Sequence, residues 1–139
     1  MKQEEITKIV NKVYPLIIQD ILIDKIGETY KNAYPEIEFH YNIYERLSGE
    51  KGMTGEVQAN AEYDWEKCII YIYTSQMYSE ENIIRSLIHE CVHSTQSKVI
   101  FDQYYKDGFT YDTHPYEIEA KEAEENWKIY FDSYYKYIK

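Results

Sequence analysis

The segment that most constrains the fold is 80–97, which reads as a helix with apolar residues around most of its circumference. Those apolar positions are Ile83, Ile84, Leu87, Ile88, Cys91 and Val92. Ser79 is a favourable N-cap, and Glu80 and Glu81 follow in the first turn, where the helix dipole favours acidic residues. A helix that is apolar on so many sides must be covered by other parts of the chain. The remaining segments are therefore expected to pack around it.

This helix carries the motif His89-Glu90-Cys91-Val92-His93. Side chains four residues apart stand one above the other on a helical face, so the two imidazoles can bind one metal ion. Zinc favours tetrahedral sites built from such ligands, and Glu90 lies close enough to take a proton from a metal-bound water. The motif predicts His89 and His93 as ligands and Glu90 as a general base. On a helix this buried, the alternative is a pair of core histidines that hydrogen-bond to protein groups.

The segments before this helix predict an α+β domain. Residues 4–34 have a helical pattern with an interruption at Pro15, which kinks one helix or opens a second. Apolar and polar residues alternate over 36–43 and 56–63, as in half-buried strands, and 68–74 is apolar on both faces, as in a strand covered on both sides. Short connections between the three strands favour a mainly antiparallel meander.

The segments after the central helix predict a loop and one long helix. Residues 98–114 read as a loop, with at most one further helical turn at its start. Pro115 suits the first position of a helix, and apolar residues then recur at threes and fours almost to the C-terminus. No internal repeat or domain boundary is visible, so 1–139 is predicted to be a single domain.

A catalytic zinc site needs a third protein ligand and an open position for water. The last helix offers Glu117 and Glu119. The face of Glu117 on a helical wheel carries other charged residues, which are Lys121, Glu124 and Lys128. That face is predicted to be solvent-exposed, whereas Glu119 lies beside the small residues Ala120 and Ala123, which would allow close helix packing. Glu119 is therefore the predicted third ligand. The alternative for it is an acidic residue stabilised by the helix dipole.

The order of helix, strands, HExxH helix and glutamate-bearing helix resembles the zincin metallopeptidases of the gluzincin type. It looks most like minimal bacterial and phage zincins such as the ImmA/IrrE-type peptidases, whose second motif has a glutamate followed by alanine, as in Glu119-Ala120. The resemblance covers about residues 54–131. It implies a zincin-like minimal metallopeptidase domain that binds zinc through His89, His93 and Glu119 and hydrolyses peptide bonds.

In such a reaction the developing oxyanion needs an electrophile in addition to the metal. Tyr111, His114 and Tyr116 lie in the sequence where such a group could sit, with a structural role as the alternative for each. Gln96 is a candidate for orienting His93 from behind. The alternative function is a non-catalytic metal-binding or protein-interaction module on the same scaffold, which a fourth ligand such as His114 would favour.

Charge and cysteine content limit the partners and the location. The formal net charge is −10 with no basic cluster, which argues against nucleic acid or an anionic membrane as a partner. The N-terminus lacks the features of a signal peptide, and the most apolar run, 16–23, is too short to span a bilayer, so a cytoplasmic location is expected. Cys68 and Cys91 are too few for a disulfide framework and are predicted to be buried free thiols. The expected partner is a peptide or protein substrate, which could bind by adding a strand to an exposed sheet edge.

Overall fold

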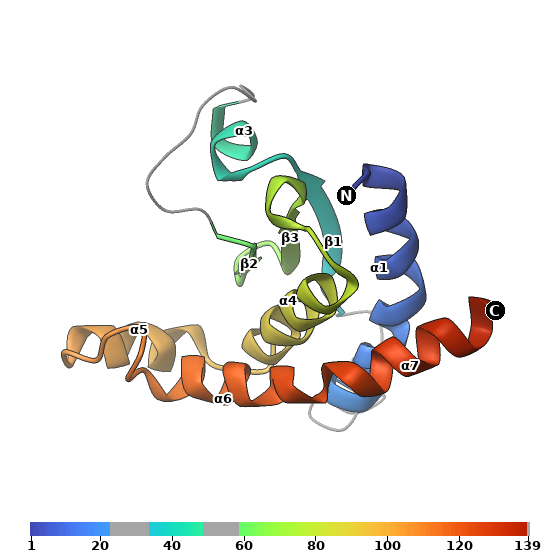
Figure 1. The fold of residues 1–139 in the computed structure, drawn as a ribbon. Coiled ribbons are helices and arrows are strands. Elements are labelled where there is room, and N and C mark those ends of the chain that lie inside the picture. Colours follow the sequence, from blue (N-terminus) through green and yellow to red (C-terminus); the bar gives the residue numbers. More distant parts are fainter. Residues whose placement is uncertain (23–33, 49–58, 139) are drawn as a thin grey trace.

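The computed structural model describes residues 1–22, 34–48 and 59–138, and these parts of the chain form an α+β fold. Helix α4 (Glu80–His93) crosses the middle of the molecule. A three-stranded mixed sheet lies on one side of it, and α6 (Pro115–Ala123) and α7 (Trp127–Ile138) lie on the other (Figure 1). The predicted α+β class and the central position of the motif-bearing helix are confirmed.

Helix α4 begins where the sequence predicts. The Ser79 hydroxyl accepts a hydrogen bond from the Asn82 backbone N–H at 3.1 Å, which satisfies one of the unpaired donors of the first turn. All six predicted apolar positions of the helix are buried. The helix ends at His93, four residues earlier than predicted, and Ser94 forms its C-cap. His93 therefore lies in the last turn of α4.

The N-terminal helix continues through its proline. Helix α1 (Gln3–Ile17) contains Pro15 and passes directly into a π-helical turn, η1 (Ile18–Leu22). Its buried stripe packs against α4 and α7 and consists of Ile6, Ile9, Val10, Val13 and Ile17. The rest of the predicted helical segment, 23–33, lies outside the described residues.

The sheet differs from the predicted antiparallel meander. Strands β1 (Glu36–His40), β2 (Ala61–Asp64) and β3 (Ile69–Tyr73) have the spatial order β1-β3-β2, with β1 parallel and β2 antiparallel to β3. β3 is apolar on both faces, and the central position buries these residues because a strand pairs with it at each edge. The chain between β1 and β3, with α3 (Ile43–Ser48) and β2, is long enough for the parallel crossover. The first part of the predicted strand 56–63 falls in 49–58, outside the described residues.

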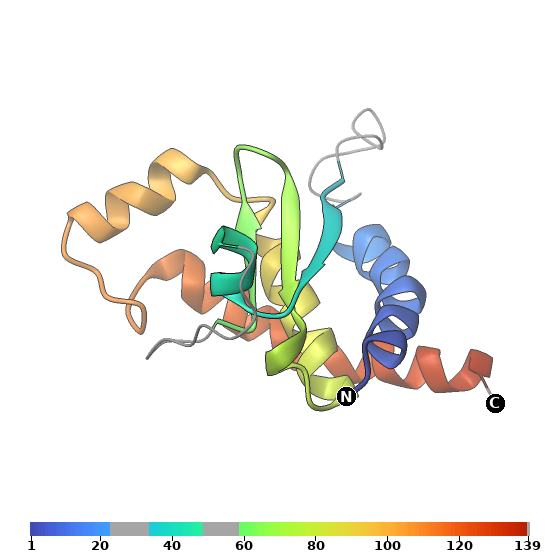
Figure 2. The same ribbon diagram turned by 90° about the horizontal axis from the view of Figure 1, so that it is seen from above.

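The segment predicted as a loop, 98–114, contains helix α5 (Lys98–Lys106), with Ser97 as its N-cap. The helix is short and none of its residues is buried, so its sequence carries little of the periodicity that a core-facing helix shows. α5 extends from the end of α4 away from α1 and α7 in both views (Figures 1 and 2). The predicted C-terminal helix begins at Pro115 as expected, but the 3-10 turn η4 (Glu124–Asn126) divides it into α6 and α7.

Both cysteines are free thiols, as predicted, with Cys91 buried in the core and Cys68 half-buried. Among the helices of the described residues, none combines the length and apolar character needed to cross a membrane.

Replacing Leu87 by alanine tests the role of α4 as the centre of the core. The Leu87 side chain is fully buried, so its truncation should lower the free energy of unfolding by about 2–5 kcal/mol through lost burial and the cavity left behind. Leu47→Ala is the matched control, because Leu47 is 69% exposed and should change stability by less than about 0.5 kcal/mol. Urea denaturation measures both. Equal effects of the two substitutions would contradict the central placement of α4.

Candidate metal centre

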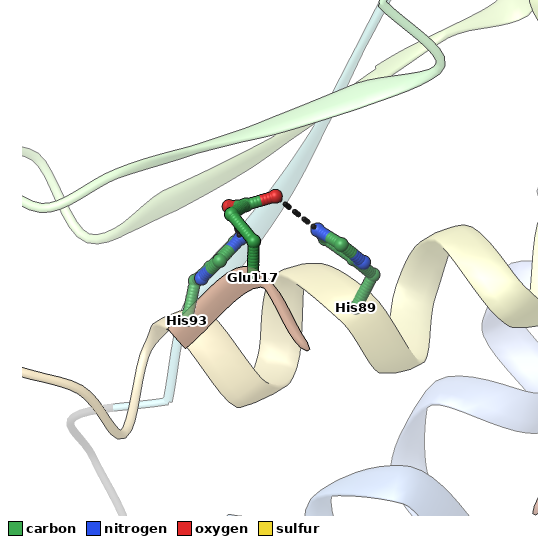
Figure 3. Close-up of side chains that lie close together, drawn as sticks. All are labelled: His89, His93 and Glu117. Carbon is green, nitrogen blue, oxygen red and sulfur yellow. Dashed lines mark ion pairs between the residues drawn. The ribbon is translucent and has the colours of Figure 1, made fainter. Parts of the chain in front are cut away.

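Two neighbouring turns of α4 and the first turn of α6 bring His89, His93 and Glu117 together (Figure 3). All three side chains are buried, and one potential ligand atom from each lies within 4.8 Å of the others. His93 Nε2 lies 2.7 Å from Glu117 Oε1, and His89 Nε2 lies 3.4 Å from Glu117 Oε2. This group could hold a metal ion.

The third residue of the group is Glu117 and not Glu119, which the sequence analysis favoured. Glu119 is exposed and lines a different pocket, together with Asp20 and Asn126. The continuous face of α6 and η4 that contacts α4 contains Glu117, Ala120 and Glu124, at intervals of three and four residues. The helical wheel assigned this face to solvent because of its charges. A helix face that carries charged residues can nevertheless be buried. Hydrophobic patterning cannot distinguish such a face from one that is exposed to solvent.

Ala120 permits the close approach of the two helices. It has no exposed surface and belongs to the core that surrounds α4. The small side chain was correctly predicted to allow close packing. It lies one turn after Glu117 and one turn before Glu124, however. The close packing at Ala120 therefore brings Glu117 and Glu124, and not Glu119, against α4.

The protonation pattern of His93 follows from its neighbours. The Gln96 amide nitrogen donates to the Tyr116 carbonyl at 3.1 Å, and this contact orients the amide because a carbonyl can only accept. The amide oxygen therefore faces His93 Nδ1, at 2.7 Å, so that Nδ1 must carry a proton. The supporting role considered for Gln96 is present, and Nε2 of His93 is turned toward Glu117.

His89 has a corresponding partner in Glu124, which the sequence analysis did not identify. Nδ1 of His89 lies 2.7 Å from Glu124 Oε2, and a carboxylate in that position fixes the proton on Nδ1. The signal in the sequence is the spacing of seven residues between Glu117 and Glu124, which puts both on one face of the helix. Each of the two histidines is thus oriented by an acceptor on its Nδ1 atom.

Three electron-pair donors consequently point at one another: two Nε2 atoms and a carboxylate. Such atoms repel unless a proton or a metal cation lies among them. Oε2 of Glu117 is also buried without a hydrogen-bond partner, although carboxylate oxygens in such positions are normally paired. A cation coordinated by the three residues would satisfy both requirements. The donors therefore fit a metal.

The pKa values of His89 and Glu117 also show that positive charge is favoured at this position. Burial acts to lower the pKa of His89, but the contacts with Glu117 and Glu124 outweigh it and raise this pKa to about 10. For Glu117, burial acts in the upward direction, whereas His89 and His93 hold its pKa well below the usual range. Glu117 is therefore an anion at neutral pH, which is the form that binds metals.

Glu90 is a buried carboxyl group beside this group of ligands. Burial raises its pKa to about 7, although His89 and His93 act in the opposite direction. A side chain with a pKa near 7 can both accept and donate a proton at neutral pH. Glu90 also lines the same cleft as the three ligand residues. Glu90 is thus a buried acid that shares the cleft with the two histidines and Glu117.

The two other catalytic candidates, His114 and Tyr111, lie in different surroundings. His114 is fully buried and caps α6: its Nδ1 accepts from the Tyr116 N–H at 3.1 Å, and its Nε2 lies 2.9 Å from the Phe101 carbonyl. Both ring nitrogens are engaged in these contacts, so His114 lies neither where the predicted catalytic group would act nor where the fourth ligand of the non-catalytic alternative would bind. Tyr111 lines the cleft with the ligand residues and is held under the Lys121 ammonium, which lies 4.1 Å from the centre of its ring.

His89, His93 and Glu117 line a cleft of about 960 Å³ between β2 and α4. One end, around His93, has aromatic walls formed by Tyr63, Trp65 and Phe101. The Trp65 indole N–H donates to the backbone carbonyl of Gln96 at 3.1 Å. This hydrogen bond attaches the β2–β3 turn to the segment after α4. The cleft is thus walled by the sheet on one side and by the two ligand-bearing helices on the other.

Comparisons with protein-family models, with curated proteins and with solved structures gave no match to this chain. The function has to be inferred from the site itself.

Paired alanine substitutions test the choice of Glu117. Glu117→Ala removes a ligand and should weaken zinc binding by more than about 100-fold, the upper end of the cost of losing a residue that supports a ligand. Glu119→Ala, two residues away and exposed, should bind zinc as the wild type does. Competition with a chromophoric chelator measures both affinities. The reverse order of effects would assign the ligand role to Glu119.

Proposed function

We propose that this protein is a zinc-dependent metallopeptidase that uses Glu90 as its general base. The observation that carries the proposal is the buried Glu90 carboxyl beside His89, His93 and Glu117, in a cleft open to substrate. A purely structural metal site has no need of such a carboxyl group and is usually closed by four ligands. His114, the candidate for a fourth ligand, has both ring nitrogens engaged elsewhere.

The donor set favours zinc. Two neutral imidazole nitrogens and one carboxylate are a common ligand set of catalytic zinc, and three protein ligands leave a coordination position for water. Zinc in such a site lowers the pKa of its bound water towards neutrality and polarises a carbonyl group. The hydrogen bonds from Nδ1 of His89 and His93 keep both Nε2 atoms available for the metal.

Glu90 supplies the proton transfers. In its carboxylate form it accepts a proton from the attacking water, and it then donates that proton to the leaving amine. A cation at the ligand residues would lower the pKa of Glu90 below its value of about 7 and so favour the form that accepts. Burial keeps the group from becoming a permanent anion, which allows it to carry the proton between the two steps.

Tyr111 is the group we assign to the oxyanion. Partial burial raises its pKa to about 12, and the nearby carboxylates of Glu117 and Glu124 act in the same direction. Its phenol is therefore protonated at neutral pH and can donate a hydrogen bond to the developing negative charge. Unlike His114, Tyr111 has its ring at the cleft and is half-exposed.

The substrate would be an extended peptide. Strand β2 lines the cleft and is one of the two edge strands of the order β1-β3-β2 among the described residues. A peptide that adds to such an edge gains backbone hydrogen bonds whatever its side chains, and its side chains then alternate in direction. This geometry would place a peptide bond along α4, over the ligand residues and Glu90.

Glu90→Gln separates catalysis from metal binding. The amide retains the size of the carboxylate but cannot accept the water's proton, so cleavage of a panel of denatured proteins should fall by about 10²–10⁴-fold. Zinc content, measured by plasma emission spectrometry, should remain near one equivalent. Cleavage at the wild-type rate by this variant would exclude Glu90 as the base. Wild-type protein that binds zinc but cleaves no substrate would favour the non-catalytic metal-binding alternative.

Tyr111→Phe tests the oxyanion assignment. Loss of one hydrogen-bond donor to the transition state should lower kcat by about 10²–10³-fold while KM and zinc affinity change little. Tyr78→Phe is the matched control, because Tyr78 also lines the cleft and is 75% exposed, but is given no part in the reaction. A change confined to KM in Tyr111→Phe would give Tyr111 a role in substrate binding instead.

A further inference from the structure

Arg85 lies on α4 one turn before His89 and lines the same cleft. It is surrounded by carboxylates from two elements. Its Nε lies 2.8 Å from Glu81 Oε2, and its Nη1 lies 3.5 Å from Glu125 Oε1 and 3.9 Å from Glu124 Oε1. The guanidinium also faces the ring of Trp127, at 5.8 Å from its centroid. The mechanism described above does not use this residue.

An arginine in a peptidase cleft could bind a carboxylate of the substrate. Here, however, the guanidinium already has three carboxylate neighbours of its own, on α4 and η4. A further anion would have to compete with all of them. Its place in the cleft therefore indicates a role within the protein.

The contact with Glu124 supplies that role. The two oxygens of this carboxylate face different partners: Oε2 lies 2.7 Å from Nδ1 of His89, and Oε1 lies 3.9 Å from Arg85 Nη1, an ion-pair contact rather than a hydrogen bond. The positive charge beside Oε1 favours the rotamer of Glu124 in which Oε2 faces His89, and the closer contact with Glu125 attaches η4, which carries both carboxylates, to α4. A planar guanidinium with several donors in fixed directions is suited to bridging neighbouring carboxylates.

We propose that Arg85 is a positioning residue for the metal centre, which acts through Glu124 to orient His89; this inference rests on the proposed metal site. Arg85 has two opposing effects on metal affinity, because its positive charge repels a metal ion while its contact with Glu124 orients His89. The charge of Arg85 is offset by Glu81 and Glu125, so the repulsion is small and the orienting effect prevails. Loss of Arg85 should therefore weaken metal binding.

A double-mutant cycle on zinc affinity tests this inference without measuring activity. Glu124→Ala should raise the Kd for zinc by about 10–100-fold, as expected for loss of a residue that orients a ligand. Arg85→Ala should raise it by a smaller factor, about 3–10-fold. In the double variant Arg85→Ala should add nothing to the effect of Glu124→Ala, because it acts through that carboxylate.

Two further variants serve as controls. Arg85→Lys retains the charge but not the planar fork, and it should lose most of the effect of Arg85 on affinity. Glu122→Gln removes the charge of an exposed carboxylate of α6 that has no part in this arrangement, and it should leave the Kd within about twofold of the wild type. Thermal unfolding in the presence of a chelator shows whether each variant folds as the wild type does. The Co²⁺ absorption spectrum reports any change in the ligand geometry.

The outcomes are distinguishable. A wild-type protein that binds neither zinc nor Co²⁺ would overturn the proposed function and this inference with it. If the wild type binds zinc and Arg85→Ala binds it equally well or more tightly, the inference alone is overturned. Independent, multiplying effects of Arg85→Ala and Glu124→Ala would also overturn it, because Arg85 would then not act through Glu124.

Discussion

The structure depends most on the convergence of two Nε2 atoms and one carboxylate between α4 and α6. Electron-pair donors at such distances repel unless a proton or a metal cation lies between them, so the crossing of the two helices depends on a positive charge as well as on apolar packing. Outer partners maintain the arrangement. Glu124 and Gln96 occupy the Nδ1 atoms of the two histidines, and the Tyr116 carbonyl orients Gln96. The orientation of His93 therefore depends, through Gln96, on a backbone carbonyl of α6.

The same helix serves the core and the site on different faces. Ile84, Leu87, Ile88 and Cys91 of α4 are buried in the hydrophobic core, whereas His89, Glu90 and His93 line the cleft. Burial of the core face fixes the position of the helix, and the rigidity of the helix then fixes the spacing of the two histidines. The polar face is expensive to bury, and Glu90 shows this directly, because its pKa rises to about 7. The groups that destabilise the fold are those to which we assign the reaction.

Several elements could be predicted because their signals are local. The N-cap at Ser79, the buried helix after it, Pro115 at the start of α6 and the pair His89/His93 all follow from short-range spacing and propensity. Other predictions failed where the deciding contact is remote. The place of β3 between β1 and β2 depends on pairing between strands that are far apart along the chain, and Nε2 of His114 is engaged by the carbonyl of Phe101 in another helix. Helix α5 was missed for a different reason, because none of its residues is buried and its sequence carries little periodicity.

The sequence by itself determined that two histidines and a glutamate share one turn-spaced motif on a buried helix, because helical periodicity places them without reference to the rest of the chain. Only the tertiary structure decided which carboxylate joins them. Hydrophobic patterning favoured Glu119, since it treats every charged face as solvent-exposed. The packing of α6 against α4 through Ala120 turns the charged face of Glu117 and Glu124 inward. A polar face is buried only where another part of the protein, or a cation, satisfies it, and that partner lies outside the local sequence.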